Sequence, residues 1–241
     1  MKLSPGDLKE IEYIDFHTHQ NFKAPHYLNI VSCDPEDFLQ RVNECDSSTL
    51  FSVGIHPWSL KGNYDQSMQR LEKLEKLLQH PQVIAIGETG LDKTRGPAAA
   101  TQIVVFSEIL KIAVRLSKPV IVHCVRFYPE IITLKKQFAP ELPVMIHGYN
   151  GKPPLLEQLF KHNCMVSFGL AALNRQDVPD FLRANPKYFN LIALETDDSN
   201  VSVKSVYARA GEVLDLSDQE LKAVMRRNFK RLFLPDDITT N

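Results

Sequence analysis

Two histidines one residue apart, His17 and His19, close an apolar stretch near the start of the chain. The stretch is typical of a short strand at about residues 12–18. Side chains alternate faces along a strand, so both imidazoles point the same way and form a ready pair of metal ligands. Taken alone, the pair also fits an ordinary surface strand, and the metal hypothesis therefore depends on the strands that follow.

Later strands end in side chains of the same chemical kind. Glu88 follows the apolar run 83–87, His123 and His147 end two further runs, and Asp197 follows the last one. Any one of them alone would more often be a buried, hydrogen-bonded group. Together the six side chains predict a site for divalent metal, with Zn, Mg, Mn, Fe and Ni not distinguished. Two ions about 3.5–4 Å apart, bridged by a carboxylate and a water, account for more ligands than one tetrahedral ion needs. The prediction is one or two ions per chain.

The elements that must position these ligands alternate along the chain. The loop at 20–26 is too short, and too interrupted by Pro25, to hold a helix. Alternating strands and helices in a chain of 241 residues predict a somewhat distorted (β/α)8 TIM barrel whose first β-α unit lacks a full helix. The expected strands are 12–18, 27–33, 50–57, 83–87, 119–123, 143–147, 165–169 and 190–196. The expected helices include 35–44, 65–80, 101–117, one that begins at Pro153, and one that begins with the capping box Ser217–Glu220.

The carboxyl ends of barrel strands converge on one face, so the predicted ligands would meet there in a single domain spanning 1–241. With 28 basic and 29 acidic residues, a net charge of −1 excludes a protein that coats nucleic acid through global charge. The four cysteines are far apart, Met1–Asp7 has no apolar signal core, and no run approaches membrane-spanning length. We therefore expect reduced thiols, a cytoplasmic location and no membrane partner, with a monomer favoured.

Several motifs in order along the chain resemble the TatD family of metal-dependent hydrolases in the amidohydrolase superfamily. They are His17-Thr18-His19, Gly54-Ile55-His56-Pro57, Gly87-Glu88-Thr89-Gly90-Leu91-Asp92, the strand-final His123 and His147, Glu195-Thr196-Asp197 and Asn228-Phe229-Lys230-Arg231-Leu232-Phe233. The resemblance spans roughly residues 13–234. It implies a distorted TIM barrel, a one- or two-metal site, and phosphodiester cleavage in DNA or RNA, often from a 3′ end. It also implies that His17, His19, Glu88 and Asp197 hold one metal, and that Glu88, His123 and His147 hold the other.

The sequence departs from that family around the predicted ligands. The departures are Lys93-Thr94-Arg95-Gly96-Pro97, Cys124-Val125-Arg126, Gly148-Tyr149-Asn150-Gly151 and Asp198-Ser199-Asn200. They leave the metal ligands untouched and bear on the substrate. Arg126 and Lys93 follow strand ends, where arginine can form a bidentate fork to phosphate, so we predict that both bind substrate. Tyr149 on the same rim is predicted to stack on a base, and Trp58 could do the same. His56 is interpreted as a hydrogen-bonding post.

These features favour an enzyme that attacks a phosphodiester with a metal-activated hydroxide. The resemblance implies a deoxyribonuclease acting at a 3′ end, whose partner is a nucleic-acid strand end or another phosphodiester substrate. Asp197 is predicted to orient the water and accept its proton, and Glu88 to lie between two ion sites. The alternatives are a hydrolase of aminoacyl esters on charged tRNA, a small-molecule amidohydrolase, and a catalytically silent barrel. A purely structural site would close with four ligands, which argues against the silent barrel.

Overall fold

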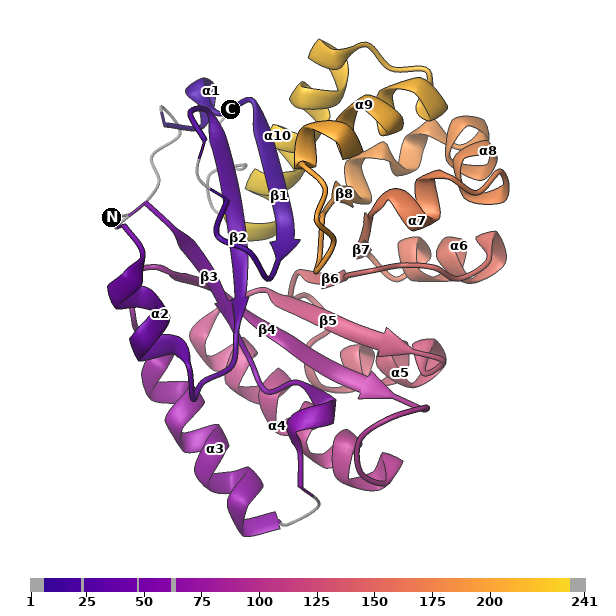
Figure 1. The fold of residues 1–241 in the computed structure, drawn as a ribbon. Helices are drawn as coiled ribbons and strands as arrows, with labels where there is room; N and C mark the ends of the chain where they lie inside the picture. Colours follow the sequence, from indigo (N-terminus) through magenta and orange to yellow (C-terminus); the bar gives the residue numbers. More distant parts are fainter. Residues whose placement is uncertain (1–6, 23, 47, 62–63, 235–241) are drawn as a thin grey trace. The chain divides into compact units, whose positions relative to one another are not determined.

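A computed structural model describes residues 7–22, 24–46, 48–61 and 64–234 (Figure 1). Strands and helices alternate along most of this length. The strands are β1 (Tyr13–Thr18), β2 (Tyr27–Cys33), β3 (Leu50–Val53), β4 (Val83–Asp92), β5 (Val120–Val125), β6 (Val144–Ile146), β7 (Cys164–Phe168) and β8 (Ile192–Leu194). The α-helices are α1 (Asp7–Glu10), α2 (Phe38–Glu44), α3 (Tyr64–Leu77), α4 (Ala99–Leu116), α5 (Tyr128–Phe138), α6 (Pro153–Lys161), α7 (Leu170–Leu173), α8 (Asp177–Ala184), α9 (Val203–Leu214) and α10 (Asp218–Phe233), and short 3-10 helices cover Pro57–Ser59 and Pro186–Leu191.

The strands form one sheet in the order β1 to β8. The pairs β1–β2, β3–β4, β4–β5, β5–β6 and β7–β8 are parallel. A parallel bridge between Thr18 and Asp197 links the end of β1 to the residues that follow β8. Sequential parallel pairing with this return to the first strand is the topology of a (β/α)8 barrel, so the predicted fold class is confirmed.

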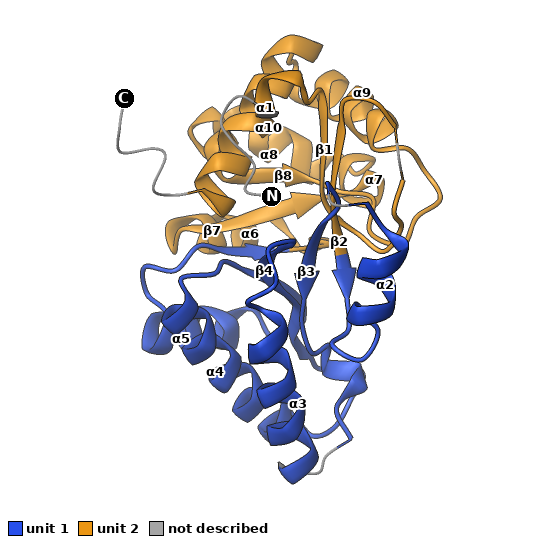
Figure 2. Cartoon of the chain, turned by 90° about the vertical axis from the view of Figure 1, so that its left-hand side faces the viewer, with its two compact units in different colours: residues 1, 32–146 blue, residues 2–31, 147–241 orange. Residues whose placement is uncertain are grey.

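The chain divides into two compact units (Figure 2). Residues 32–146 form unit 1, and residues 2–31 with 147–241 form unit 2. The predicted single domain therefore stays a prediction. Within unit 1, α4 packs on β4, and the Phe38 and Phe51 rings meet edge to face at 5.4 Å between centroids.

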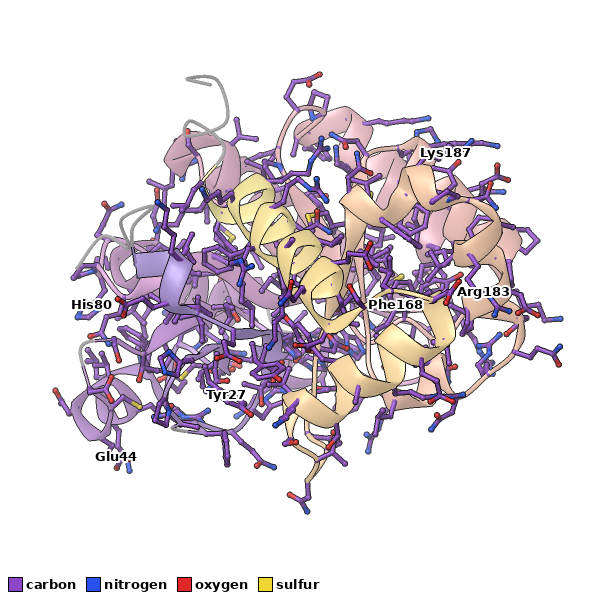
Figure 3. The ribbon with its side chains drawn as sticks, turned by 90° about the horizontal axis from the view of Figure 1, so that it is seen from above. Tyr27, Glu44, His80, Phe168, Arg183 and Lys187 are labelled. Carbon is purple, nitrogen blue, oxygen red and sulfur yellow. The ribbon has the colours of Figure 1, made fainter. Side chains whose placement is uncertain are left out.

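The core of unit 2 joins β1 to the last two helices. The rings of Phe16 and Phe229 lie 6.2 Å apart. The hydroxyl of Tyr207 accepts from the Ile14 N–H at 3.0 Å and donates to the Ile14 carbonyl at 3.2 Å. Phe168, labelled in Figure 3, has a fully buried side chain. The contacts of Phe16 and Ile14 fix β1, which carries His17 and is followed directly by His19.

The sequence located most elements, with shifts at their ends. The strand 27–33 has the predicted bounds, no helix lies between β1 and β2 in the described residues, and the capping box on α10 is formed by Ser217 and Glu220. The strand predicted at 83–87 continues to Asp92, because β4 goes on pairing with β5 as far as Asp92–Val125. The helix expected from Pro35 begins at Phe38, after a turn.

No helix in the described part of the chain has the length and apolar character needed to cross a membrane. Residues 1–6, on which the absence of a signal core was predicted, lie outside the described residues.

Candidate active site

Strand β1 carries His17, and His19 follows directly after its end, so that both histidines lie around one carboxylate in unit 2. The Nε2 atoms of His17 and His19 lie 3.5 Å and 3.4 Å from Oδ1 of Asp197. The His17 side chain is fully buried, whereas that of His19 is 42% exposed. The expectation that both imidazoles point the same way is therefore met, because both approach one oxygen atom.

The backbone holds Asp197 against β1. Its N–H donates to the His17 carbonyl at 3.0 Å, and its own carbonyl accepts from the His19 N–H at 3.1 Å. The residue adopts a φ of 55°, in the left-handed region that Asp tolerates better than most residues. His147 completes the group, with its ring centroid 4.1 Å from that of His17. His17, His147 and Asp197 each offer one ligand atom within 4.8 Å of the others.

The surroundings of Asp197 keep its carboxylate ionised. Burial alone would raise its pKa, but hydrogen bonds from His17 and His19 and the charge of His17 and His147 hold the pKa well below its usual range. The side chain is 38% exposed, so solvent still reaches it. An ionised, partly exposed carboxylate beside imidazole nitrogens can bind a cation and can contact a water molecule.

Two buried carboxylates, Glu195 and Asp15, form hydrogen bonds with residues next to this group. Glu195 accepts from the Gly148 N–H at 2.6 Å and from the Ser167 hydroxyl, and burial raises its pKa to about 8. Asp15 accepts from the Thr196 hydroxyl at 2.6 Å, and burial raises its pKa to about 6. The sequence reasoning did not assign these roles. The available signal was spacing, because Asp15 and Glu195 each stand two residues before a predicted ligand.

Unit 1 holds a second group around Glu88. Oε1 of Glu88 lies 2.8 Å from Nδ1 of His123 and 3.1 Å from Nε2 of His56. These three residues also offer ligand atoms within 4.8 Å of one another. His56 does act as a hydrogen-bonding post, since its Nδ1 accepts from the Trp58 N–H at 3.1 Å. Its approach to Glu88 was not predicted.

Asp92 lies beside this group, and the sequence alone did not single it out as a candidate site residue. Its Oδ2 accepts from the Trp58 indole N–H at 2.6 Å and lies 3.2 Å from Nε2 of His123. Burial alone would raise its pKa, but hydrogen bonds from Thr94, Trp58 and His123 pull the pKa well below the usual range. His123 thus lies between two carboxylates. Burial lowers its pKa, and hydrogen bonds and charge from Glu88 and Asp92 outweigh burial and raise it.

Close strand packing explains the glycines of the Gly87 to Asp92 run. Gly90 has a φ of +143°, and a Cβ there would lie 2.1 Å from the His123 carbonyl oxygen. Gly87 has a φ of +158°, and its Cβ would lie 2.6 Å from the Ile121 carbonyl oxygen. No side chain fits at either position. The absence of side chains therefore sets how closely β4, which carries Glu88, approaches β5, which carries His123.

The donor atoms around Asp197 have the spacing of ligands to a divalent ion. Neighbouring ligand atoms around a tetrahedral ion with bonds of about 2.1 Å lie about 3.4 Å apart, which matches the separations of 3.5 Å and 3.4 Å from Asp197 to the two imidazoles. The separations of 2.8 Å and 3.1 Å around Glu88 are those of hydrogen bonds. Glu88 belongs to unit 1 and His17 to unit 2, so the predicted bridging role of Glu88 stays a prediction.

The predicted substrate residues have different outcomes. Lys93 and Arg126 are exposed directly after β4 and β5, and the Lys93 N–H donates to the Val125 carbonyl at 3.0 Å. Their phosphate-binding role stays a prediction. Tyr149 is only 1% exposed, because its hydroxyl donates to the Lys152 carbonyl and its ring packs edge to face on Phe168. The prediction that Tyr149 binds substrate by stacking on a base is therefore wrong.

Trp58 is an aromatic residue of unit 1 that is exposed. Its side chain is 46% exposed, and the Arg95 guanidinium lies 4.1 Å from its ring centroid. This distance is typical of a cation–π contact. Trp58 thus combines an accessible ring with a hydrogen bond to Asp92, next to His123.

The chain is similar to several known proteins. The family model described as TatD related DNase matches residues 14–234. A human protein named 3'-5' RNA nuclease TATDN2 is 30% identical over 206 residues, covering 76% of this chain and 26% of that protein. A Schizosaccharomyces pombe protein named deoxyribonuclease Tat-D is 28% identical, covering 68% of this chain and 55% of that protein. The chain thus spans between a quarter and just over half of these relatives.

Among solved structures, the crystal structure of YJJV, a TatD homologue from Escherichia coli, has a TM-score of 0.78 at 22% identity. The match covers 93% of this chain and 98% of the YJJV chain. At this level of identity the likeness concerns the fold, and it supports the barrel topology described above.

Proposed function

We propose that this chain, which belongs to the TatD-related DNase family, is a metal-dependent phosphodiesterase that releases nucleotides from the 3′ end of a single nucleic-acid strand. The observation that carries the proposal is the group of His17, His19 and Asp197, in which two imidazoles approach one ionised carboxylate at ligand spacing. The names of the relatives support the reaction class, since one is a 3'-5' RNA nuclease and another a deoxyribonuclease.

The proposed metal ligands are those predicted from the sequence: His17, His19, Glu88, His123, His147 and Asp197. A bound divalent ion would polarise a phosphoryl oxygen and lower the pKa of a water molecule toward neutrality. Neutral imidazole and ionised carboxylate are the forms that bind metal. Because the pKa of Asp197 is low, its carboxylate is in the ionised form.

The side chains of this protein then have separate tasks. The Asp197 side chain is 38% exposed, so its carboxylate can accept a proton from a water molecule beside His17 and His19. Asp92 lies against Nε2 of His123 at 3.2 Å. That contact orients the ring and leaves Nδ1 directed at Glu88. Glu88 and Asp197 are the proposed catalytic carboxylates.

Substrate binding is proposed to be local and electrostatic. Lys93 and Arg126 are exposed at the ends of β4 and β5, and Arg95 lies on Trp58 in the same unit. Arg126 has a φ of 60°, which directs the chain away from the strand immediately after Val125. With a net charge of −1, the protein favours a strand end over a long duplex. We place this activity in the cytoplasm of the cell, in a monomer.

A substrate panel tests the proposal. Metal-reconstituted protein is incubated with single-stranded DNA, single-stranded RNA, aminoacylated tRNA and a neutral ester, and the products are separated by length. We expect a 5′-labelled strand to give a ladder of labelled products shortened one nucleotide at a time from the 3′ end, with the ester left intact. Hydrolysis of aminoacyl-tRNA or of the neutral ester, with intact DNA and RNA, would contradict the proposal and favour an ester or amide hydrolase.

A further inference from the structure

A cavity of about 200 Å³ lies in unit 2 beside the residues that flank the proposed metal ligands. Its lining residues include Thr18, which lies between His17 and His19 in the sequence, and Thr196, which precedes Asp197. The Thr18 hydroxyl donates to the Asp197 carbonyl at 3.3 Å, and the Thr196 hydroxyl lies 3.1 Å from that of Thr18. None of the proposed metal ligands is among the described residues that line the cavity. The cavity is joined to the proposed catalytic group, within one unit, through the hydrogen bond from Thr18 to the Asp197 backbone.

The walls of this cavity carry exposed apolar side chains. Phe22, in the loop between β1 and β2, is 53% exposed, and Val201, in the loop before α9, is 36% exposed. Phe22 is held in place, because its carbonyl accepts from the Asn29 side-chain amide and its ring lies 5.8 Å from that of Tyr27. A single exposed apolar residue is ordinary on a protein surface, but two that line the same cavity indicate a ligand with an apolar face.

Amide side chains provide the polar complement. Gln20 and Asn200 line the cavity, and the Gln20 amide donates to the Asn200 side-chain oxygen at 2.9 Å. A primary amide carries two donor hydrogens and an acceptor oxygen, so this pair can present both an acceptor and a donor to a ligand. Paired donors and acceptors beside an aromatic ring match the edge and the face of a nucleobase.

Charge argues for a base rather than a phosphate in this cavity. Among its described lining residues none is basic, and the one charged group is the buried Asp15. Among these described lining residues an anionic phosphate would meet no cation, and it would lie close to the Asp15 carboxyl group. The volume of about 200 Å³ equals that of roughly seven liquid water molecules, which is below the usual range for drug-sized ligands of about 300–1,000 Å³. Its volume and charge favour a single small, uncharged group as the ligand.

We propose that this cavity binds the nucleobase of the 3′-terminal nucleotide, with Phe22 stacking on the base and Gln20 and Asn200 contacting its edge. The inference rests on the proposed function, and it adds a subsite that would hold the nucleotide to be released. Phe22, Gln20 and Asn200 are binding residues here, and the chemistry remains with the ligand group around Asp197.

The test compares two single-stranded oligodeoxynucleotides that differ at the 3′-terminal residue. One ends in a normal nucleoside, and the other ends in a tetrahydrofuran residue that lacks the base. The readout is the ratio of kcat/KM for the two substrates with metal-reconstituted enzyme. Stacking of one base on an aromatic side chain corresponds to a preference of about 5- to 150-fold. We expect the wild-type enzyme to prefer the base-bearing substrate within that range.

Variants assign the preference to the cavity. Phe22→Ala is expected to bring the ratio close to one, Phe22→Tyr to preserve it, and Gln20→Ala to reduce it. Leu39→Ala is the matched control, because Leu39 is an exposed apolar residue, 58% accessible, on α2 of unit 1, and it should leave the ratio unchanged. A wild-type ratio near one, or a ratio that Phe22→Ala and Gln20→Ala both leave intact, would overturn the inference while the nuclease activity itself stands. Failure to release nucleotides from either substrate would instead overturn the proposed function.

Discussion

Replacing Gly90 with alanine tests how the fold builds the second ligand group. The new Cβ would lie 2.1 Å from the His123 carbonyl oxygen, and the φ of +143° is one that L-residues rarely adopt. The backbone strain is worth about 1–3 kcal/mol, and the overpacking adds about 1–3 kcal/mol. We therefore expect the free energy of unfolding to fall by about 2–6 kcal/mol, out of a total of about 5–15 kcal/mol.

Relief of this clash would also displace His123, whose Nδ1 lies 2.8 Å from Glu88. The variant should consequently bind less metal as well as unfold at lower urea concentration, as measured by circular dichroism and by metal content after dialysis. Gly169→Ala is the matched control. A Cβ there would lie no closer than 3.5 Å, from the Glu195 carbonyl oxygen, and φ is −94°, so its stability should change by less than about 1 kcal/mol. Equal stabilities for the two variants would refute the packing argument.

Three further predictions concern the proposed chemistry. Asp197→Asn should lower kcat/KM by at least about a hundredfold, and the fold should persist because the backbone contacts of residue 197 to β1 remain. The control is Asp198→Asn, which neutralises the adjacent exposed carboxylate and should retain activity. A folded and active Asp197→Asn protein would remove Asp197 from the mechanism. His147→Ala should reduce bound metal toward one ion per chain in elemental analysis, whereas an unchanged content would leave a one-ion site. Arg126→Ala and Lys93→Ala should each raise KM on DNA by a factor that shrinks as the salt concentration increases, and the metal content should not change. An equal loss of activity on a neutral ester would show that these residues support the structure of the site.

The sequence predicted those parts of the fold that depend on local pattern. The apolar runs located the strands because their side chains are buried on both faces. The capping box at Ser217 is a contact over three residues, and it was found for that reason. The histidine pair followed from the alternation of side chains in a strand. In each case the deciding interaction lies within a few residues of the chain.

The contacts that sequence reasoning did not find join distant residues. Trp58 and Asp92 are 34 positions apart and share a hydrogen bond, and Glu88 approaches His56 over a similar separation. Tyr149 was placed on a rim because it follows a strand end, but a hydrogen bond to Lys152 and packing on Phe168 turn it inward. Such outcomes depend on which side chains pack across the sheet, and no local pattern determines them.

The central claim is a metal-dependent release of nucleotides from a 3′ end, and the most direct measurement is a chelation and reconstitution cycle on a 5′-labelled single strand. Wild-type protein is stripped with a chelator, dialysed, and assayed before and after the addition of each candidate ion, with bound metal counted in the same samples. We predict a ladder of products shortened one nucleotide at a time, absent after stripping and restored in proportion to the metal bound. Full activity in the stripped protein, or stoichiometric metal binding with no cleavage by any of the ions, would contradict it.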